Sequence, residues 1–368
     1  MPDSLSFDDS DDSYTGSAAS SVVTRRRLQS GLESLDGDQC LEIYRLMVRT
    51  RALEERTIKM SKSGEGFFWV GGPGEEAFNV CLGLQVLRGR GPAYDYLHLH
   101  YRNAGIMVAL GMPMLDHVRQ MAMTATDRHS RGRNFVGHYS MPEWNVLPVT
   151  SVIEVQYTMA PGTALMQKRQ GGEGVSIVIG GDAGTAEGDF TSCMIWSTRP
   201  GNELPVFMTV TNNGYGISTP ARTQHGERRI SDRGEVFGIP GETVDGNDVV
   251  AVWHAIERGM DVCRRQRKPY LLEAKVSRLH GHSSSSGAAR VGGEADCLKT
   301  FEKKLVTAGI IHRELAEMIH HDAHEEADQA VEQAMREPRP TAEDVERFTF
   351  APSTVDAVYP NDYTGLPQ

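Results

Sequence analysis

The sequence predicts an α/β fold in which a mostly parallel sheet carries helices on both faces. Three apolar runs, at residues 175–179, 204–210 and 270–276, have the length of strands and are rich in branched side chains. Such runs are typical of parallel strands that are buried on both sides. Open α/β sheets bind their ligands at the carboxyl ends of the strands, so we expect the functional site at that edge.

The first two runs end in polar, glycine-rich motifs. The segment 180–189 reads GGDAGTAEGD and the segment 212–215 reads NNGY, with Asn213 standing 31 residues after Asp182. A right-handed crossover would bring these two strand ends side by side. Magnesium prefers an octahedral cage of oxygens that includes phosphate oxygens, and a carboxylate, an amide and a backbone carbonyl leave room for them.

The glycines of the first motif fit the same interpretation. Gly181 and Gly184 would let the backbone approach a diphosphate closely, and a helix beginning near Ala186 would aim its amino end at the same anion. Either motif alone is more often an ordinary turn. Together they predict a split site for magnesium diphosphate, which indicates thiamine diphosphate chemistry.

Further polar clusters accompany the strands. The segment 94–102, YDYLHLHYR, ends in two histidines, a tyrosine and an arginine, and suits either a solvated edge strand or a ligand contact. The segment 280–287, HGHSSSSG, follows the third run and is either a flexible linker or a catalytic loop. The glycine turn 71–74 is either a simple helix entry or part of the site.

Helices are expected between these segments. The pattern of apolar residues predicts helices at 39–61, from the glycine turn to Leu87, at 155–166, at 249–266 with Asp248 as the cap, and at 298–335. Residues 128–151 have few helix signals, and a loop of that length inside a domain is usually functional or disordered.

Composition limits the class of protein. The net charge of −11 argues against a nucleic-acid-binding role. The five cysteines are far apart without a CxxC pair, which favours free thiols in a reducing compartment. We see no apolar stretch long enough for a membrane span and no secretory core or transit peptide, so we expect a cytoplasmic protein with no membrane partner.

Three parts are expected along the 368 residues. Residues 1–37, rich in Ser and Asp, are predicted to be a flexible acidic tail. Residues 38–335 are expected to form the main domain, and residues 336–368, with five prolines, to form an extended arm.

The motifs resemble those of the α subunit of the thiamine diphosphate-dependent decarboxylating component of 2-oxo acid dehydrogenase complexes. Four blocks carry the resemblance in order, at 181–190 (GDAGTAEGDF), 212–219 (NNGYGIST), 244–248 (VDGND) and 280–283 (HGHS). The resemblance covers residues 38–335 and is nearest to the branched-chain, 2-oxoisovalerate type. It implies a thiamine-diphosphate-binding fold with the diphosphate at the carboxyl ends of the strands.

The resemblance also assigns roles to residues. It implies that the side chains of Asp182 and Asn213 and the backbone carbonyl of Tyr215 bind Mg²⁺. It places His282, and with it His138, among the catalytic residues. The cofactor contacts that it implies are His100, Tyr101, Arg102, Ser151, Ile153, Asp182, Ala183, Gly184, Asn213 and His282. His282 would donate or accept a proton near neutral pH.

The implied activity is the oxidative decarboxylation of a 2-oxo acid and transfer of the acyl group to a lipoyl disulfide. The implied partners are a β subunit, in an assembly of two α and two β chains, and the lipoyl-bearing dihydrolipoyl acyltransferase core. Because the family's β subunit supplies a glutamate that activates the cofactor, the chain alone should be inactive.

Some positions depart from the family pattern. Ala183 replaces the last glycine of Gly-Asp-Gly, Thr211 stands where branched-chain relatives often have Arg, and Ser286-Gly287 replaces the acidic pair of the phosphorylation loop. The last departure leaves open how the loop is ordered and whether Ser283 is phosphorylated.

Three other functions fit parts of the same sequence pattern. A pyruvate or acetoin dehydrogenase α subunit has similar motifs, and the histidine loop fits it. A self-sufficient thiamine enzyme would need a further pyrimidine-binding domain. A non-catalytic α/β nucleotide-binding domain would leave the histidine loop and the Tyr101-Arg102 pair without explanation.

Overall fold

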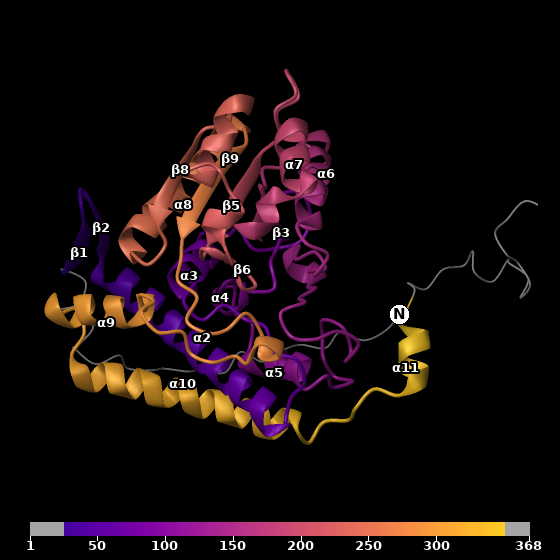
Figure 1. Cartoon of the computed structure of the whole chain (residues 1–368), viewed down its shortest axis with the longest axis vertical. Coiled ribbons are helices and arrows are strands. Elements are labelled where there is room, and N and C mark those ends of the chain that lie inside the picture. The colour runs from indigo at the N-terminus through magenta and orange to yellow at the C-terminus, as the bar shows by residue number, and fades with distance from the viewer. Residues whose placement is uncertain (1–25, 350–368) are drawn as a thin grey trace, which may run out of the picture.

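The structure is a computed structural model that describes residues 26–349. Its main sheet has five parallel strands in the order β3 (Tyr96–His98), β4 (Ser176–Gly181), β5 (Val206–Asn212), β9 (Tyr270–Lys275) and β8 (Gly241–Asp245). The predicted α/β class and the three predicted strands are confirmed (Figure 1). Gly181 pairs with Thr211, so the two motif-bearing strand ends are neighbours as expected.

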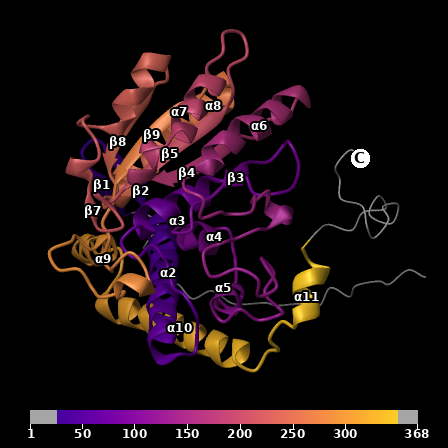
Figure 2. The ribbon, with the colours of Figure 1, turned by 45° about the vertical axis from the view of Figure 1, so that its right-hand side comes forward.

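Helices cover both faces of this sheet. α6 (Val155–Arg169) packs on β3, β4 and β5 with α7 (Gly188–Ser197) beside it. α8 (Val249–Gln266) packs on β5, β8 and β9, and against it lies α3 (Glu76–Gln85), which contacts α4 (Ala104–Ala109) (Figures 1 and 2). Successive strand residues serve opposite cores, since Phe207 belongs to the cluster with α8 and Met208 to the cluster with α6.

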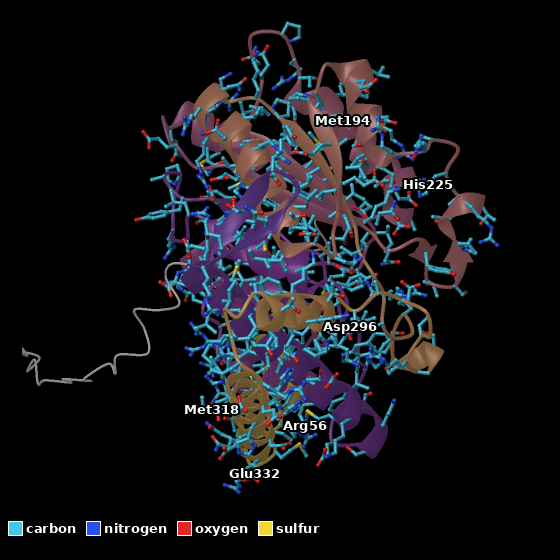
Figure 3. All side chains as sticks on the ribbon, turned by 90° about the vertical axis from the view of Figure 1, so that its left-hand side faces the viewer. Arg56, Met194, His225, Asp296, Met318 and Glu332 are labelled. Atoms are coloured by element: carbon cyan, nitrogen blue, oxygen red, sulfur yellow. The ribbon has the colours of Figure 1, made fainter. Side chains whose placement is uncertain are left out.

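A layer of long helices lies below the sheet. α2 (Gly37–Ser63) and α10 (Arg313–Ala334) run along each other, with α9 (Cys297–Thr307) and α5 (Met114–Met121) beside them. Figure 3 labels Arg56 on α2 and Met318 and Glu332 on α10, and Arg56 pairs with Asp328 of α10 at 2.7 Å. The single helix predicted at 298–335 is two helices, because Gly309 adopts a left-handed φ of 65° between them.

The predicted tail over residues 1–37 needs correction. Residues 1–25 lie outside the described part, but β1 (Arg27–Ser30) and β2 (Glu33–Asp36) form an antiparallel hairpin. The hairpin packs on α8, and Asp36 caps α2 by accepting a hydrogen bond from the backbone N–H of Gln39. Of the predicted C-terminal arm, the described part contains a short helix, α11 (Ala342–Arg347).

The helix expected near Ala186 begins later. A 3₁₀ turn, η2 (Ala183–Ala186), follows Asp182, and α7 begins only at Gly188 after an extended Glu187. The α-helical amino end is therefore separated from the first motif by one turn.

The remaining short elements are η1 (Pro142–Trp144), β6 (Tyr215–Gly216), β7 (Thr219–Pro220), η3 (Ala221–Thr223), η4 (Ile230–Phe237) and η5 (Ser284–Ser286). The predicted loop at 128–151 has only η1 and isolated bridges. Among residues 26–349, no helix combines the length and the apolar character that a membrane span needs.

Candidate active site

A cavity of about 460 Å³ lies at the carboxyl ends of β4 and β5. Ten of the predicted site residues line it: His100, Tyr101, Arg102, Ile153, Asp182, Ala183, Gly184, Asn213, Tyr215 and His282. They come from segments far apart in the sequence, and the parallel sheet brings these segments to one edge. His138 and Ser151 do not line the cavity.

Asp182 has the properties expected of a cation ligand. Its side chain is buried, and one carboxylate oxygen, Oδ2, is inaccessible and has no hydrogen-bond partner. Burial raises the pKa of this carboxyl. Burial of a carboxylate oxygen without a partner costs free energy unless a cation or a hydrogen-bond donor contacts it. Asn213 and Tyr215 line the same cavity and add the oxygen donors that Mg²⁺ prefers.

The donor set contains only one carboxylate. Within the described ranges, no group of three or more His, Cys, Asp or Glu side chains is arranged to hold a metal. This arrangement suits a Mg²⁺ ion that takes part of its shell from phosphate oxygens and water rather than an all-protein metal cage.

Ala183, which departs from the family pattern, joins the two halves of the site. A Cβ added at Gly216 would lie 2.6 Å from the Cβ of Ala183. The extra methyl group is thus accommodated because the facing residue of the second motif is glycine.

Arg102 organises the cationic side of the cavity. Its Nη2 donates to Nδ1 of His282 at 2.9 Å and to the carbonyl of His282 at 3.3 Å. Its guanidinium also lies 5.4 Å from the centre of the Tyr101 ring. Since Nδ1 accepts a hydrogen bond, the proton of the neutral His282 ring is on Nε2.

The charge state of His282 is set by its surroundings. Burial, with the nearby charges of Arg102 and Arg278, lowers the pKa of His282 to about 4. The ring is therefore uncharged at neutral pH. Nε2–H is then available as a hydrogen-bond donor, and the proton-transfer role that the resemblance implies stays a prediction.

The other two histidines have different environments. The pKa of His100 is held well below its usual value by burial and by Arg102, and its Nδ1 has no partner. Nε2 of His138 lies 2.5 Å from Oγ of Ser151, and its ring stacks at 6.4 Å from that of Tyr101. His138 thus lies between Tyr101 and Ser151, and neither His138 nor Ser151 is part of the cavity wall.

The His282 loop is ordered without the acidic pair of the family. Ser283 and Ser286 form a reciprocal capping box around η5. The backbone of Ser284 donates to the carbonyl of Trp69 at 2.8 Å, and the backbone of Trp69 donates to Oγ of Ser284 at 3.1 Å. Ser283 itself is buried.

The glycine turn 71–74 belongs to the site as well as to a helix entry. A Cβ at Gly72 would lie 2.4 Å from the carbonyl oxygen of Arg102, and Arg102 donates to the carbonyl of Gly71. Glu54 fixes the turn from below, because its carboxylate accepts hydrogen bonds from Nε1 of Trp69 and the backbone of Gly72.

Three buried acids near the site were missed by sequence reasoning. Burial raises the pKa of Glu54 to about 7 and those of Glu75 and Glu154 to about 8. Glu75 has no hydrogen-bond partner on either carboxylate oxygen, whereas Glu154 lines the cavity. Charged residues on a helix or in a loop are usually solvated, so the sequence carries no signal for their burial.

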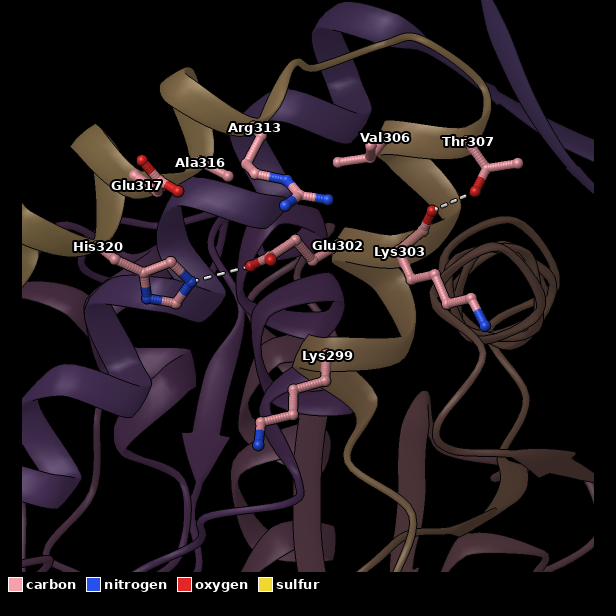
Figure 4. Close-up of a pocket in the computed structure, with 9 residues that line it drawn as sticks. All are labelled: Lys299, Glu302, Lys303, Val306, Thr307, Arg313, Ala316, Glu317 and His320. Atoms are coloured by element: carbon pink, nitrogen blue, oxygen red, sulfur yellow. Dashed lines mark hydrogen bonds and ion pairs between the residues drawn. The ribbon is translucent and has the colours of Figure 1, made fainter.

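A second cavity, of about 530 Å³, lies between α9 and α10 (Figure 4). Lys299 and Lys303 point in different directions there, and Glu302 is bound by Nε2 of His320 at 2.9 Å. This cavity shares no residue with the site at the sheet edge. The five cysteines are all buried and free, as predicted.

Comparisons with known proteins identify the family of this chain. The family described as "Dehydrogenase E1 component" matches residues 44–343. A 2-oxoisovalerate dehydrogenase subunit alpha of Bacillus subtilis is 27% identical over 325 residues, which cover 86% of this chain and 97% of the relative. A mitochondrial 2-oxoisovalerate dehydrogenase subunit alpha 2 of Arabidopsis thaliana is 28% identical over 250 residues, or 68% of this chain and 51% of the relative.

A pyruvate dehydrogenase E1 component subunit alpha, also from Bacillus subtilis, is 27% identical over 331 residues, which cover 88% of this chain and 85% of the relative. The family match spans the sheet, the split motif and the histidine loop together. This chain therefore belongs to the dehydrogenase E1 component family.

Proposed function

We propose that this protein is the α subunit of a thiamine diphosphate-dependent 2-oxo acid dehydrogenase that acts on branched-chain substrates such as 2-oxoisovalerate. The observation that carries the proposal is the convergence of Asp182, Asn213, Arg102 and His282 in one cavity at the sheet edge. The family to which the chain belongs depends on thiamine diphosphate. The 2-oxoisovalerate relatives favour the branched-chain substrate, and the pyruvate dehydrogenase relative keeps pyruvate as the alternative.

The residues present fit the cofactor. The side chains of Asp182 and Asn213 and the backbone carbonyl of Tyr215 would hold Mg²⁺, which the buried, unpartnered Oδ2 of Asp182 supports. Arg102, Tyr101 and His100 would contact the diphosphate. Ser151 and Ile153 would contact the aminopyrimidine through the backbone.

When bound, thiamine diphosphate supplies the electron sink for loss of carbon dioxide from the 2-oxo acid. The side chains of this chain would orient the bound cofactor and substrate. Arg102 holds His282 so that Nε2–H is the donor, and His282 lines the cavity that receives the reacting groups. His138 supports the ring of Tyr101 from behind and would act through it.

A β subunit completes the site in this proposal. Three apolar side chains on the cavity wall, Ile153, Tyr215 and Ile217, are 39–58% exposed. Clustered exposed apolar groups mark contact surfaces. We infer that the β subunit covers them, in an assembly of two α and two β chains, and that the acyl product passes to the lipoyl disulfide of an acyltransferase core.

The direct test is decarboxylation of 2-oxoisovalerate and of pyruvate with thiamine diphosphate, Mg²⁺ and an artificial electron acceptor. The assay is run with this chain alone, its cognate β subunit alone and the two together. Activity only in the mixture, faster with 2-oxoisovalerate, is the expected result. Activity of the isolated chain would contradict the shared site, and faster turnover of pyruvate would identify the alternative substrate.

A further inference from the structure

Glu154 has an unusual backbone at the wall of the cavity. It stands immediately before α6 with φ 61° and ψ 6°, the left-handed region that non-glycine residues seldom adopt. Its side chain makes no cap bond to α6, although it occupies the cap position. Strain of this kind persists where the surrounding structure over-determines it, and it gathers at functional sites.

The side chain of Glu154 turns instead to the first motif. Its Oε1 accepts a hydrogen bond from the backbone N–H of Gly181 at 3.2 Å, and the residue is only 3% exposed. Gly181 immediately precedes Asp182. The carboxyl group of Glu154 thus holds the backbone that presents the expected metal ligand.

Two glycines of the motif leave the room that this carboxyl group occupies. A Cβ at Gly180 would lie 2.1 Å from Oε2 of Glu154, and a Cβ at Gly184 would lie 1.8 Å from Oε1. Gly181, by contrast, has nothing within 4 Å of an added Cβ. Glu154 therefore fills the space that two missing side chains leave, and of the two glycines expected to allow close approach of a ligand, Gly181 and Gly184, only Gly181 has open surroundings.

The protonation state of the Glu154 carboxyl group fits a role in holding the backbone. Burial is the main cause that raises the pKa of Glu154 to about 8, and the nearby Asp182 acts in the same direction. A neutral carboxyl group adds no repulsion beside Asp182 and an anionic ligand. Glutamine, neutral and equal in size, is then the conservative replacement.

We propose that Glu154 is a positioning residue that fixes the 180–184 turn, and through it the carboxylate of Asp182, for the metal–diphosphate end of the cofactor. This inference rests on the proposed function. It also gives Gly184 a different role from the one expected, since this glycine makes room for Glu154 as well as lining the cavity.

The first test measures the dissociation constant of thiamine diphosphate with Mg²⁺ in the assembly of this chain with its cognate β subunit. Loss of a group that orients a metal ligand typically costs about 10–100-fold. We expect Glu154→Ala to weaken binding by at least about tenfold and Glu154→Gln by less than about threefold, which is the rescue that a positioning role requires.

Two variants control this measurement. Glu173→Ala removes an exposed acid that precedes β4, at the end of the strand opposite the motif, and should leave the constant unchanged. Glu154→Gly accepts the left-handed backbone without strain and should bind as weakly as Glu154→Ala. Wild-type affinity of Glu154→Ala, or equal weakness of Glu154→Gln and Glu154→Ala, would overturn the proposal.

The second test needs no cofactor. Gly184→Ala is made in the wild type and in Glu154→Ala, and thermal unfolding of the unliganded assembly is measured. Removing Glu154 opens the space for the new methyl group, so Gly184→Ala should lower the melting temperature less in the Glu154→Ala background. Equal losses in both backgrounds would contradict the packing argument. If the wild type binds no thiamine diphosphate, the proposed function fails while this cycle still decides the role of Glu154.

Discussion

The two halves of the split site are built in opposite ways. The half that carries Asp182 lies in the interior, held by Glu154 and closed by the tightly packed Gly180 and Gly184. The half that carries Asn213 lies at the surface, where Tyr215 is 39% exposed and Ile217 is 58% exposed.

The surface half supports itself by local hydrogen bonds. The backbone of Gly214 donates to Oδ1 of Asn212 at 3.0 Å, and the backbone of Tyr215 donates to Oδ1 of Asn213 at 3.2 Å. Such turns depend on few residues and are readily opened. The difference indicates that the fold of the chain alone positions the carboxylate of Asp182, whereas the ligand and the partner must order the half that carries Asn213.

The largest effect is expected from a substitution in the buried half of the site. Asp182→Ala should weaken Mg²⁺-dependent cofactor binding by more than about 100-fold, beyond what loss of a supporting group costs. The unliganded protein should melt at the same temperature or roughly 2 °C higher, because a buried and unpartnered carboxylate oxygen is removed. Calorimetric titration and thermal unfolding measure the two quantities. A clear drop in melting temperature would contradict this account.

The buried acids near the interior half predict a pH dependence. The pKa values of Glu75 and Glu154 rise from 4.5 to about 8 on folding, so their contribution to stability is present at low pH and is lost as pH rises through 8. The histidines with lowered pKa values act in the opposite direction until their unfolded rings, whose ordinary pKa is 6.5, have lost their protons, which is nearly complete by about pH 7.5. We therefore expect the melting temperature of the unliganded chain to fall from about pH 7.5 to about 8.5 and then to level off.

Glu75→Gln isolates this effect. Its melting temperature should fall less than that of the wild type over the same range, because the amide cannot ionise. Parallel curves for the two proteins would show that Glu75 does not titrate there. The comparison is made without Mg²⁺ and cofactor, since either would bind the folded state and add its own stabilisation.

A moderate effect is expected in the surface half. Asn212→Ala removes the acceptor for Gly214 and the donor to Oε1 of Glu273, a bond of 2.7 Å to a buried carboxylate. The free energy of unfolding should fall by about 1–3 kcal/mol. Hydrogen exchange should increase at residues 213–219 and remain unchanged at residues 180–184. Equal loss of protection in both halves would refute the separation between them.

The smallest effect is expected at Tyr215. Only its backbone carbonyl is assigned to the metal, so Tyr215→Phe should change the cofactor dissociation constant by less than about twofold, within the usual limits for a surface substitution. Isothermal titration of the assembly with thiamine diphosphate measures this. A tenfold change would assign the hydroxyl group a direct role.

The same contrast explains what the sequence predicts well. The strands that precede Asp182 and Asn213 are apolar because helices cover both faces, and parallel strand ends must meet at one edge. Ten expected site residues therefore gather in one cavity. The strands follow from the chain's own local composition, whereas the ten site residues were assigned by the resemblance to the family.

Features set by tertiary contacts could not be predicted. Nothing near Glu154 in the sequence indicates a left-handed backbone or a buried carboxyl group, and the room for that carboxyl group is left by glycines of a distant strand end. β8 is half-buried and has no apolar alternation, so it reads as loop. The hairpin of residues 27–36 gains its stability from α8 rather than from its own polar sequence.

The packing of α10 along α2 has a consequence for biosynthesis. Arg49 of α2 bonds to Glu326 of α10, and the two are 277 residues apart. At about 5–20 residues per second, roughly 15–55 s of translation separate them. Within residues 26–349, α2 is the first long helix to leave the ribosome and α10 is the last long one. The apolar stripe of α2 is therefore available to chaperones, or to aggregation, throughout that interval.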